Sequence, residues 1–600
     1  MRIVLVPSPV SDHYFAGNLV PTGTLSVATV LRHSGFDVRI LDINSMDEDV
    51  SVEETVTRVQ ALMPDVVGLS TWCSHYTRSL EFAQRCKQLM PDVPVVFGGP
   101  TASSTARPTV ETFHEIDLVV RGECEHTIVQ VMSALGDREK LRTIPGLTFR
   151  DGSEIVSTPS ASPIRNLNSV PFPDFDLMPS LSRIKGTPHH PFFIEVGRGC
   201  PFRCTYCCLE GVSMGRYRRR SSDSLVHFIR KLVQNDAKEY FYFVHDNFSF
   251  ARSRIAEFCQ CLQLEGLDMG WRCSSRADCL DDELLERMAA AGCKSIFMGI
   301  ESGSPRMQTI TKKGLDLNHV VSIARRIVDL GMSFSASFII GLPQENLEDL
   351  EASMRLMAEL ECIGDPDVLS VYPYMAAPLP GSALYEEYGT GLRFDGVFSD
   401  VSWVRLTDYE IGLIQRYPDV FPQFYYYPTP HLDRRLVTRL QRFMLILLHM
   451  RYTLLLLLNA PELGFPGSLL CELPPPEFSP KFQPKGVHSV EIGDLQIALD
   501  FISRRFGSMG LRDHPVHDVM KYELTLRKVQ HDKTGRYSNE LEYFTYDVKS
   551  WVHRVSPNAR SVSVSEISRD PNAVLFAKQD SDVVAYKLPV DIGLSSRPFQ

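Results

Sequence analysis

The chain has 600 residues, which is too long for one hydrophobic core and predicts several domains. Apolar residues make up 44% of it and charged residues 22%, a balance that favours packed cores and excludes a largely disordered chain. The formal net charge of -11 repels a phosphate backbone, so we expect no nucleic acid as a partner.

The sequence predicts no signal peptide and no transmembrane segment. Residues 1–7 form a short apolar run that ends in proline, without the longer apolar region and cleavage site of a signal peptide. The most apolar later stretch, residues 443–458, contains His449 and Arg451 and is shorter than the about 20 residues that a bilayer needs. We therefore expect a cytoplasmic protein with no transmembrane segment, whose 14 cysteines do not form a disulfide framework.

The first part of the chain alternates short β-branched runs with segments of helical periodicity, up to about residue 136. This alternation is typical of a parallel sheet with crossover helices. It predicts an α/β, doubly wound, Rossmann-like domain over residues 1–145, with five strands at 3–7, 36–43, 65–70, 93–99 and 117–122.

Residues 146–190 lose this rhythm, and the prolines among them predict an extended linker. A second α/β domain follows over residues 191–400, in which six strands alternate with helices and predict a partial (β/α)6 barrel of the TIM type. The expected strands are 192–197, 240–245, 271–275, 295–300, 333–340 and 368–374. Residues 401–600 predict a mainly helical C-terminal domain that caps the barrel mouth and shapes the substrate pocket.

Three cysteines with the spacing C-x3-C-x2-C follow the first barrel strand, at Cys200, Cys204 and Cys207. Three thiolates on one loop can hold three corners of a cubane iron–sulfur cluster and leave its fourth iron open to a non-protein ligand. A structural zinc site would need a fourth Cys or His nearby, and a redox pair would need only two cysteines. We therefore predict that this triad binds a cluster, with Cys208 as a spare thiol.

This motif, with Tyr206 before its last cysteine, resembles that of the radical S-adenosylmethionine (SAM) superfamily. Three later segments resemble further strand motifs of that superfamily and occur in the expected order: SRAD at 275–278, GIESGS at 299–304 and FIIGLP at 338–343. The resemblance implies a [4Fe–4S] cluster that binds SAM and cleaves it to a 5′-deoxyadenosyl radical. It also implies an electron donor such as flavodoxin or ferredoxin, and includes Tyr206 among the cofactor contacts.

The same resemblance implies SAM contacts at the strand ends. Asp246 and Asn247 would hydrogen-bond the methionyl ammonium, and Arg276 would pair with the carboxylate or ribose. Glu301 and Ser302 would hold ribose hydroxyls. An ordinary strand-end cap is the alternative for each.

The first domain resembles the cobalamin-binding domain that precedes such barrels. The resemblance rests on loops after the third, fourth and fifth strands, where glycines let the backbone approach a corrin or nucleotide closely. The expected cobalamin contacts are Ser70, Thr71, Gly98, Gly99, Gly122 and Glu123. A flavodoxin-like domain without this ligand would show similar glycines.

Cobalamin domains that bind cobalt through histidine carry D-x-H-x-x-G in the first loop, whereas residues 11–17 read SDHYFAG. The resemblance therefore implies a cobalt without a lower histidine ligand, and we expect His75 at the surface. The basic run at 216–220 is expected either to attract an anionic substrate or the cobalamin tail, or to be a solvated start of a helix capped by Ser221 and Ser222.

Together the resemblances imply a cobalamin-dependent radical SAM methyltransferase. It would act on an unactivated carbon or phosphorus of a small-molecule or peptide precursor, of the kind found in antibiotic biosynthesis, with SAM as both radical source and methyl donor. Two alternatives remain open: a cyclase or ring-rearranging enzyme with the same cofactors, and a non-catalytic cobalamin or iron–sulfur sensor.

Overall fold

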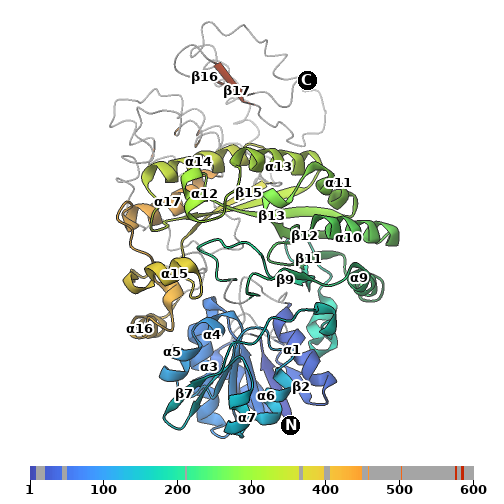
Figure 1. Cartoon of the computed structure of the whole chain (residues 1–600), viewed down its shortest axis with the longest axis vertical. Helices are drawn as coiled ribbons and strands as arrows, with labels where there is room; N and C mark the ends of the chain where they lie inside the picture. Colours follow the sequence, from blue (N-terminus) through green and yellow to red (C-terminus); the bar gives the residue numbers. More distant parts are fainter. Residues whose placement is uncertain are drawn as a thin grey trace, which may run out of the picture.

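The computed structural model describes residues 1–7, 20–42, 50–209, 213–363, 369–397 and 406–448, and a few positions beyond them. These residues form two α/β bodies. In Figure 1 the N-terminal domain, in blue, lies below the barrel, in green. Among the described residues no helix is both long and apolar enough to cross a membrane.

Five parallel strands form most of the N-terminal sheet: β1 (Arg2–Val6), β2 (Asp37–Ile40), β3 (Val66–Ser70), β4 (Val95–Gly98) and β5 (Leu118–Val120). The order β2-β1-β3-β4-β5 places β1 between β2 and β3, so the winding direction reverses there. The doubly wound fold is therefore confirmed. Its helices are α1 (Thr22–His33), α2 (Val52–Ala61), η2 (Cys73–His75), α3 (Tyr76–Leu89), α4 (Pro100–Ser104), α5 (Ala106–Thr112), α6 (Ile128–Ala134) and α7 (Arg138–Thr143).

The N-terminal sheet is larger than the sequence predicted, because β6 (Leu147–Asp151) and β7 (Glu154–Ser157) extend it with antiparallel strands. They form a hairpin whose tight turn contains Gly152, with φ of +61°. Asp-Gly between two short strands is a strong hairpin signal, and Leu147 and Phe149 alternate toward the core. The predicted boundary at residue 145 therefore falls inside this sheet.

The predicted linker is packed and contains three short helices: η3 (Leu167–Ser169), η4 (Phe175–Leu177) and η5 (Pro179–Arg183). Ile164, Leu167 and Val170 form a small buried cluster. Phe172 stacks on Phe228 of the barrel, with ring centroids 4.0 Å apart. The segment is thus a layer between the two domains and not an extended, solvated connection.

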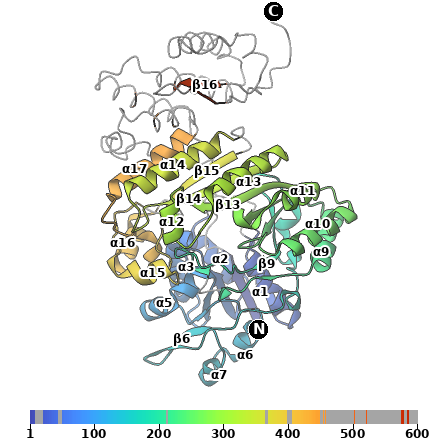
Figure 2. The ribbon, with the colours of Figure 1, turned by 45° about the horizontal axis from the view of Figure 1, so that its top comes forward.

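Six parallel strands form the second sheet, in the order β15-β14-β13-β12-β11-β8. They are β8 (Phe192–Glu195), β11 (Tyr240–Val244), β12 (Gly270–Ser275), β13 (Cys293–Glu301), β14 (Ser333–Ile340) and β15 (Leu369–Met375). The helices α9 (Ser222–Asp236), α10 (Arg252–Glu265), η6 (Ala277–Cys279), α11 (Asp282–Ala290), α12 (Pro305–Ile310), α13 (Leu317–Asp329) and α14 (Leu347–Glu361) connect them. In Figure 2 helices α10, α11, α13 and α14 follow the outer side of this sheet. The partial barrel is confirmed.

A small hairpin stands apart from the barrel sheet, in which β9 (Gly197–Arg198) pairs antiparallel with β10 (Arg218–Arg219).

The described part of the C-terminal region contains α15 (Ala383–Tyr388), η7 (Gly389–Gly391), α16 (Asp408–Arg416), η8 (Pro422–Phe424) and α17 (Arg434–Leu447). It ties the barrel to the N-terminal domain. Glu410 of α16 accepts a hydrogen bond from Thr77 of α3 at 2.8 Å, and Phe421 meets Tyr76 with ring centroids 5.8 Å apart. Beyond residue 448, a short antiparallel pair, β16 (Val574–Ala577) and β17 (Val583–Tyr586), is described. The predicted capping role stays a prediction.

Candidate functional site

The cysteine loop begins where β9 ends, and its first residues are held firmly. Gly199 has a φ of +84°, and a Cβ there would overlap the carbonyl oxygen of Arg216. Only glycine fits such a close approach of two backbones. The Gly199 N–H donates to the Asp246 carboxylate at 2.6 Å. The residue before Cys200 is therefore fixed by both the small hairpin and the end of β11.

The three predicted cluster ligands influence one another. The pKa of Cys207 is raised to about 12, mainly by burial and in smaller part by the neighbouring Cys208, Cys204 and Cys200. Burial also raises the pKa of Cys200, and Cys204 adds to that effect. The three thiols are thus near neighbours on one loop.

A cubane cluster needs three separate thiolates on this loop. In the described part of the chain, no three His, Cys, Asp or Glu side chains converge closely enough to share one metal ion. In a cubane each thiolate binds a different iron, so the thiols need not converge on one point. Burial raises the pKa of Cys208, and Asp246 is the charged neighbour that adds to this effect. Burial raises the pKa of Cys207 as well, so the choice of Cys207 as the third ligand rests on the spacing of the motif.

Arg276 lies against the cluster loop. Its guanidinium donates to both Asp278 oxygens, at 3.0 and 2.9 Å, and to the Lys313 carbonyl at 2.7 Å. It also donates to Cys204 Sγ at 3.6 Å and lies 3.7 Å from the Phe202 ring centroid. Asp278 occupies this fork in the structure, and the side chain is also a neighbour of a cluster thiolate. The expected contact with the SAM carboxylate or ribose stays a prediction.

Asp246 and Asn247 follow β11, and their surroundings differ. Burial raises the pKa of Asp246, whose carboxylate already accepts from Gly199. Asn247 is fully buried, and its Nδ2 donates to Cys279 Sγ at 3.5 Å. Its Oδ1 has no hydrogen-bond partner within the described ranges. Because a buried acceptor without a partner is costly, Asn247 suits the SAM ammonium better than Asp246 does.

Glu301 and Ser302 are both buried at the end of β13. Glu301 has a φ of +70°, at a bulge between β13 and β14, which is a strained conformation for a residue with a side chain. Its carboxylate pairs with Lys313 at 3.2 Å. The Ser302 hydroxyl lies 3.1 Å from that of Ser353. The Ser302 hydroxyl thus belongs to an internal network, and the expected ribose contacts of Glu301 and Ser302 stay predictions.

Tyr206 belongs to the cluster loop and lies against the C-terminal segment. It packs against an apolar group at the carboxyl ends of the barrel strands, consisting of Met307, Leu342, Ala376, Leu384 and Tyr427. Burial raises the pKa of Tyr206 well above its ordinary value, and the charge of Glu301 raises it further. The main chain of α15 reaches the same loop, since the Leu384 N–H donates to Thr205 at 2.8 Å.

Four of the expected cobalamin contacts lie together at the carboxyl edge of the N-terminal sheet. The Thr71 hydroxyl donates to the Gly98 carbonyl at 2.8 Å. Gly99 has φ +93° and ψ 175°, a conformation that only glycine adopts readily. A Cβ on Gly99 would lie 2.8 Å from the backbone N and O of Thr71 and 3.3 Å from the Ser70 hydroxyl. The loops after β3 and β4 therefore touch each other at Gly99 and Thr71.

Sequence reasoning missed Trp72, whose large indole follows Thr71 directly and is 59% exposed. The signal in the sequence is a large aromatic residue in the loop that follows β3. The expectation for His75 was wrong, because this side chain is buried and its Nδ1 lies 3.0 Å from the Ser74 hydroxyl. The loop at 11–17 lies outside the described residues.

Glu123, an expected cobalamin contact, is held by other parts of the protein in this structure, and its contact with cobalamin stays a prediction. Arg218 donates to both of its oxygens, at 2.7 and 2.8 Å, and the Ile164 N–H donates at 3.0 Å. The neighbouring Gly122, with φ +74°, donates its N–H to Ser103 at 3.1 Å. The loop after β5 thus faces the barrel and the packed linker segment.

The basic run at 216–220 is exposed only at Arg216, and both expectations were wrong for Arg218, Arg219 and Arg220, which are buried. Arg219 lies 4.4 Å from the ring centroid of Phe258, and Arg220 lies 4.3 Å from that of Phe172. Helix α9 begins at Ser222 as expected, but the side chain before it makes no capping hydrogen bond. The sequence shows the charges but not the distant rings and carboxylates that neutralise them.

Comparisons with known proteins match both domains. Residues 194–357 match the radical SAM superfamily, and residues 13–132 match the B12 binding domain. A Pyrococcus horikoshii protein named as an uncharacterized methyltransferase is 28% identical over 61% of this chain and 78% of its own length. An anaerobic magnesium-protoporphyrin IX monomethyl ester cyclase of Cereibacter sphaeroides is 27% identical over 62% of this chain and 61% of its own.

Among solved structures, the cobalamin-dependent SAM radical enzyme OxsB, with aqua-cobalamin and SAM bound, is 15% identical with a TM-score of 0.59. The match covers 94% of this chain and 82% of OxsB, and it shows a shared fold.

These matches and the cysteine loop define a protein in which a B12-binding domain precedes a radical SAM domain. The chain therefore carries the two domains of the cobalamin-dependent radical SAM enzymes, a B12 binding domain followed by a radical SAM domain. Its cofactors are a [4Fe–4S] cluster, SAM and cobalamin. The structure fits them, because it supplies three neighbouring thiols, the unpartnered Asn247 Oδ1 and the glycine-lined edge near Thr71.

Proposed function

We propose that this enzyme transfers a methyl group from SAM to an unactivated carbon or phosphorus of a small molecule or peptide. The observation that carries the proposal is the junction between the domains. The loop after β5 binds the hairpin that leads into the cysteine loop, through Glu125 and Arg198 at 2.5 Å. Two cofactor sites so connected can act on one substrate held between them. Methyl transfer is favoured by a relative that is named as a methyltransferase.

When bound, the cluster and SAM supply a carbon-centred radical, and cobalamin carries the methyl group. The residues of this chain hold and orient these groups. Cys200, Cys204 and Cys207 are the proposed cluster ligands, with the loop backbone anchored on Asp246. Asn247 Oδ1 is the proposed acceptor for the SAM ammonium. For cobalamin we propose the edge formed by Ser70, Thr71, Gly98 and Gly99, with Trp72 beside it.

The proposal also covers the remaining cofactor contacts, the electron donor and the cellular compartment. Gly122 and Tyr206 border the two sites, and Glu301 positions Lys313 beside the cluster loop. An external reductant such as flavodoxin or ferredoxin would supply electrons to the cluster. No two cysteines of the described residues form a disulfide, which supports a reducing, cytoplasmic setting.

The proposal predicts the products of SAM. With substrate and reductant present, 5′-deoxyadenosine and S-adenosylhomocysteine are expected in roughly equal amounts to methylated product, because SAM is used once as radical source and once as methyl donor. Cys204→Ala should abolish 5′-deoxyadenosine and product. Liquid chromatography with mass detection measures all three. Product formed without substrate-dependent S-adenosylhomocysteine would favour a cyclase, which the second relative supports, and no turnover of SAM would favour a sensor.

The position of Arg276 predicts a measurable effect of this residue on the reduction potential of the cluster. Its N–H donates to Cys204 Sγ at 3.6 Å, and a positive donor stabilises the more negative, reduced cluster. A hydrogen bond to a charged group contributes about 1.5 kcal/mol, which corresponds to about 60 mV for a one-electron couple. Arg276→Gln should therefore shift the potential downward by this order in a redox titration followed by electron paramagnetic resonance (EPR).

The matched control is Arg272→Gln on β12, the strand that Arg276 directly follows; the Arg272 guanidinium lies 4.9 Å from the Tyr242 ring centroid. It should leave the cluster potential unchanged. Equal potentials in the wild type and Arg276→Gln would show that this arginine does not act on the cluster.

A further inference from the structure

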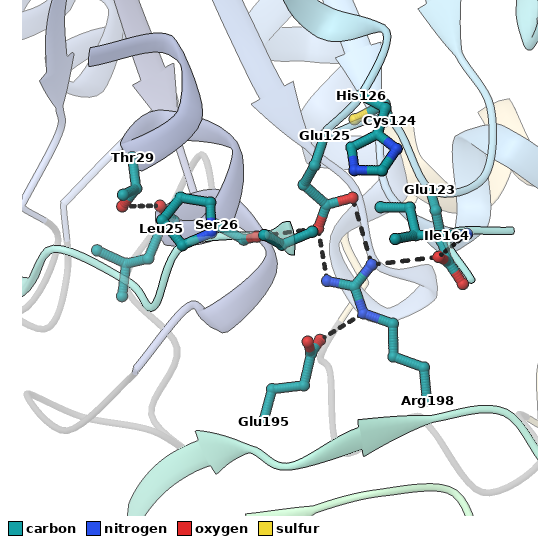
Figure 3. A network of polar contacts seen from close by, with 12 residues as sticks. Leu25, Ser26, Thr29, Glu123, Cys124, Glu125, His126, Ile164, Glu195 and Arg198 are labelled. Carbon is teal, nitrogen blue, oxygen red and sulfur yellow. Dashed lines mark hydrogen bonds and ion pairs between the residues drawn. The ribbon is translucent and has the colours of Figure 1, made fainter. Parts of the chain in front are cut away.

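A buried network of ion pairs joins the loop after β5 to the strand that leads into the cysteine loop (Figure 3). Arg198 is its centre. The guanidinium contacts Glu125 at 2.5 Å, Glu195 at 2.9 Å and Glu123 at 3.4 Å. Glu125 also accepts a hydrogen bond from Ser26 of α1 at 2.9 Å. The network therefore spans α1, the loop after β5, β8 and β9.

A second arginine, Arg218, also connects the small hairpin to the loop after β5. Arg198 and Arg218 are direct cross-strand partners in the small hairpin. Glu123 pairs with both of them, with Arg218 at 2.7 Å and Arg198 at 3.4 Å. The hairpin thus presents two guanidinium groups to a segment of three residues, 123–125, and their planar forks fix orientation as well as distance.

The network lies between the two proposed cofactor sites. Arg198 is two residues before Cys200, and Gly199 between them is itself held by Asp246. On the other side, residues 123–125 directly follow Gly122 at the carboxyl end of β5. β5 pairs with β4, which carries Gly98 at its end. A short path of bonded residues and ion pairs therefore leads from the cobalamin edge to the first cluster ligand.

The charges of this network are buried, which disfavours any other arrangement of the two domains. The side chains of Glu125 and Arg198 are only 5% and 13% exposed. Burial alone would raise the pKa of Glu125, but the charge and hydrogen bonds of Arg198 outweigh it and lower the value. Separating the domains, or sliding one over the other, would leave these charges buried without partners, which is strongly unfavourable. The network therefore selects one relative position of the two domains.

We propose that Arg198 is a positioning residue that fixes the distance and orientation between the cobalamin edge and the cluster loop. The proposal depends on the presence of both cofactors in one chain and not on methyl transfer, so each can fail without the other. A residue that only stabilised the fold would change cofactor content or thermal stability. A positioning residue changes the separation of two cofactors that are both still bound.

The test measures that separation in the full-length holoenzyme. A reduced cluster broadens and speeds the relaxation of the cob(II)alamin EPR signal, to a degree that falls steeply with distance. In Arg198→Met and Glu125→Gln proteins that carry full iron and cobalamin, we expect slower cob(II)alamin relaxation and a wider spread of distances. Arg198→Lys should fall between them and the wild type, because it keeps the charge and loses the fork.

The matched control is Arg142→Met, which removes an arginine that contacts two carboxylates, Asp151 and Glu154, within the N-terminal domain alone. Its relaxation should equal that of the wild type. If Arg198→Met does not retain both cofactors, Glu125→Gln decides the matter, since it keeps the side-chain shape and loses the charge. Wild-type relaxation in the loaded Glu125→Gln protein would overturn the proposal.

Discussion

Replacing Cys200, Cys204 and Cys207 together by alanine should lower the iron content from about four per chain to near zero, because these thiolates are the proposed protein ligands of the cubane. The brown colour and the EPR signal of the reduced cluster should disappear with it. Cobalamin binding should remain, since its edge lies on the other domain. Iron and cobalt are measured in the same samples by elemental analysis after anaerobic reconstitution.

Cys208→Ala is the matched control for the triad, because this thiol is the neighbour of Cys207 and is also partly buried. It should keep the full iron content. Retention of the cluster in the triple variant, or stoichiometric zinc in the wild type, would contradict the cluster assignment. Loss of iron from Cys208→Ala alone would move the third ligand by one residue.

Gly99→Ala should abolish cobalamin binding and leave the cluster intact. A Cβ at this position would lie 2.8 Å from the Thr71 backbone, so the loops after β3 and β4 must move apart. The φ of +93° adds a cost of about 1–3 kcal/mol for any residue other than glycine. The corrin absorbance of the purified, cobalamin-supplemented protein measures the loss directly.

Gly136→Ala separates the clash from the backbone strain. Gly136 has nearly the same φ, +91°, in the same domain, but a Cβ there would meet no atom within 4 Å. This variant should lose stability in thermal unfolding and still bind cobalamin. Equal cobalamin content in Gly99→Ala and the wild type would show that the corrin does not use this edge.

The sequence predicted the elements that repeat a simple pattern. Both parallel sheets followed from β-branched runs alternating with helical periodicity, and the six barrel strands lie within a few residues of the prediction. The β6–β7 hairpin was missed because the prolines that follow it drew the whole stretch into a linker, although Asp151 and Gly152 carried the turn signal.

The site was predictable where chemistry depends on local spacing and not where it depends on distant partners. The cysteine triad follows from the spacing of neighbouring residues, and the candidates Ser70, Thr71, Gly98 and Gly99 follow from their positions at strand ends. Glu123 looked like a ligand contact because its partner, Arg218, is 95 residues away. Ser302 is ambiguous for the same reason, since its neighbour Ser353 comes from α14. A charged or polar residue at a strand end has the same local signal whether it binds a cofactor or a neighbouring segment.

The most direct test of the central claim follows the methyl group of SAM itself. The holoenzyme is reduced anaerobically with SAM carrying a deuterated methyl group, and the bound corrinoid and all small molecules are then analysed by mass spectrometry. Methyl transfer predicts S-adenosylhomocysteine together with the labelled methyl group on cobalamin, and later on the product when substrate is added. A cobalamin that never acquires the label, in a protein that still produces 5′-deoxyadenosine from the same SAM, would contradict the account.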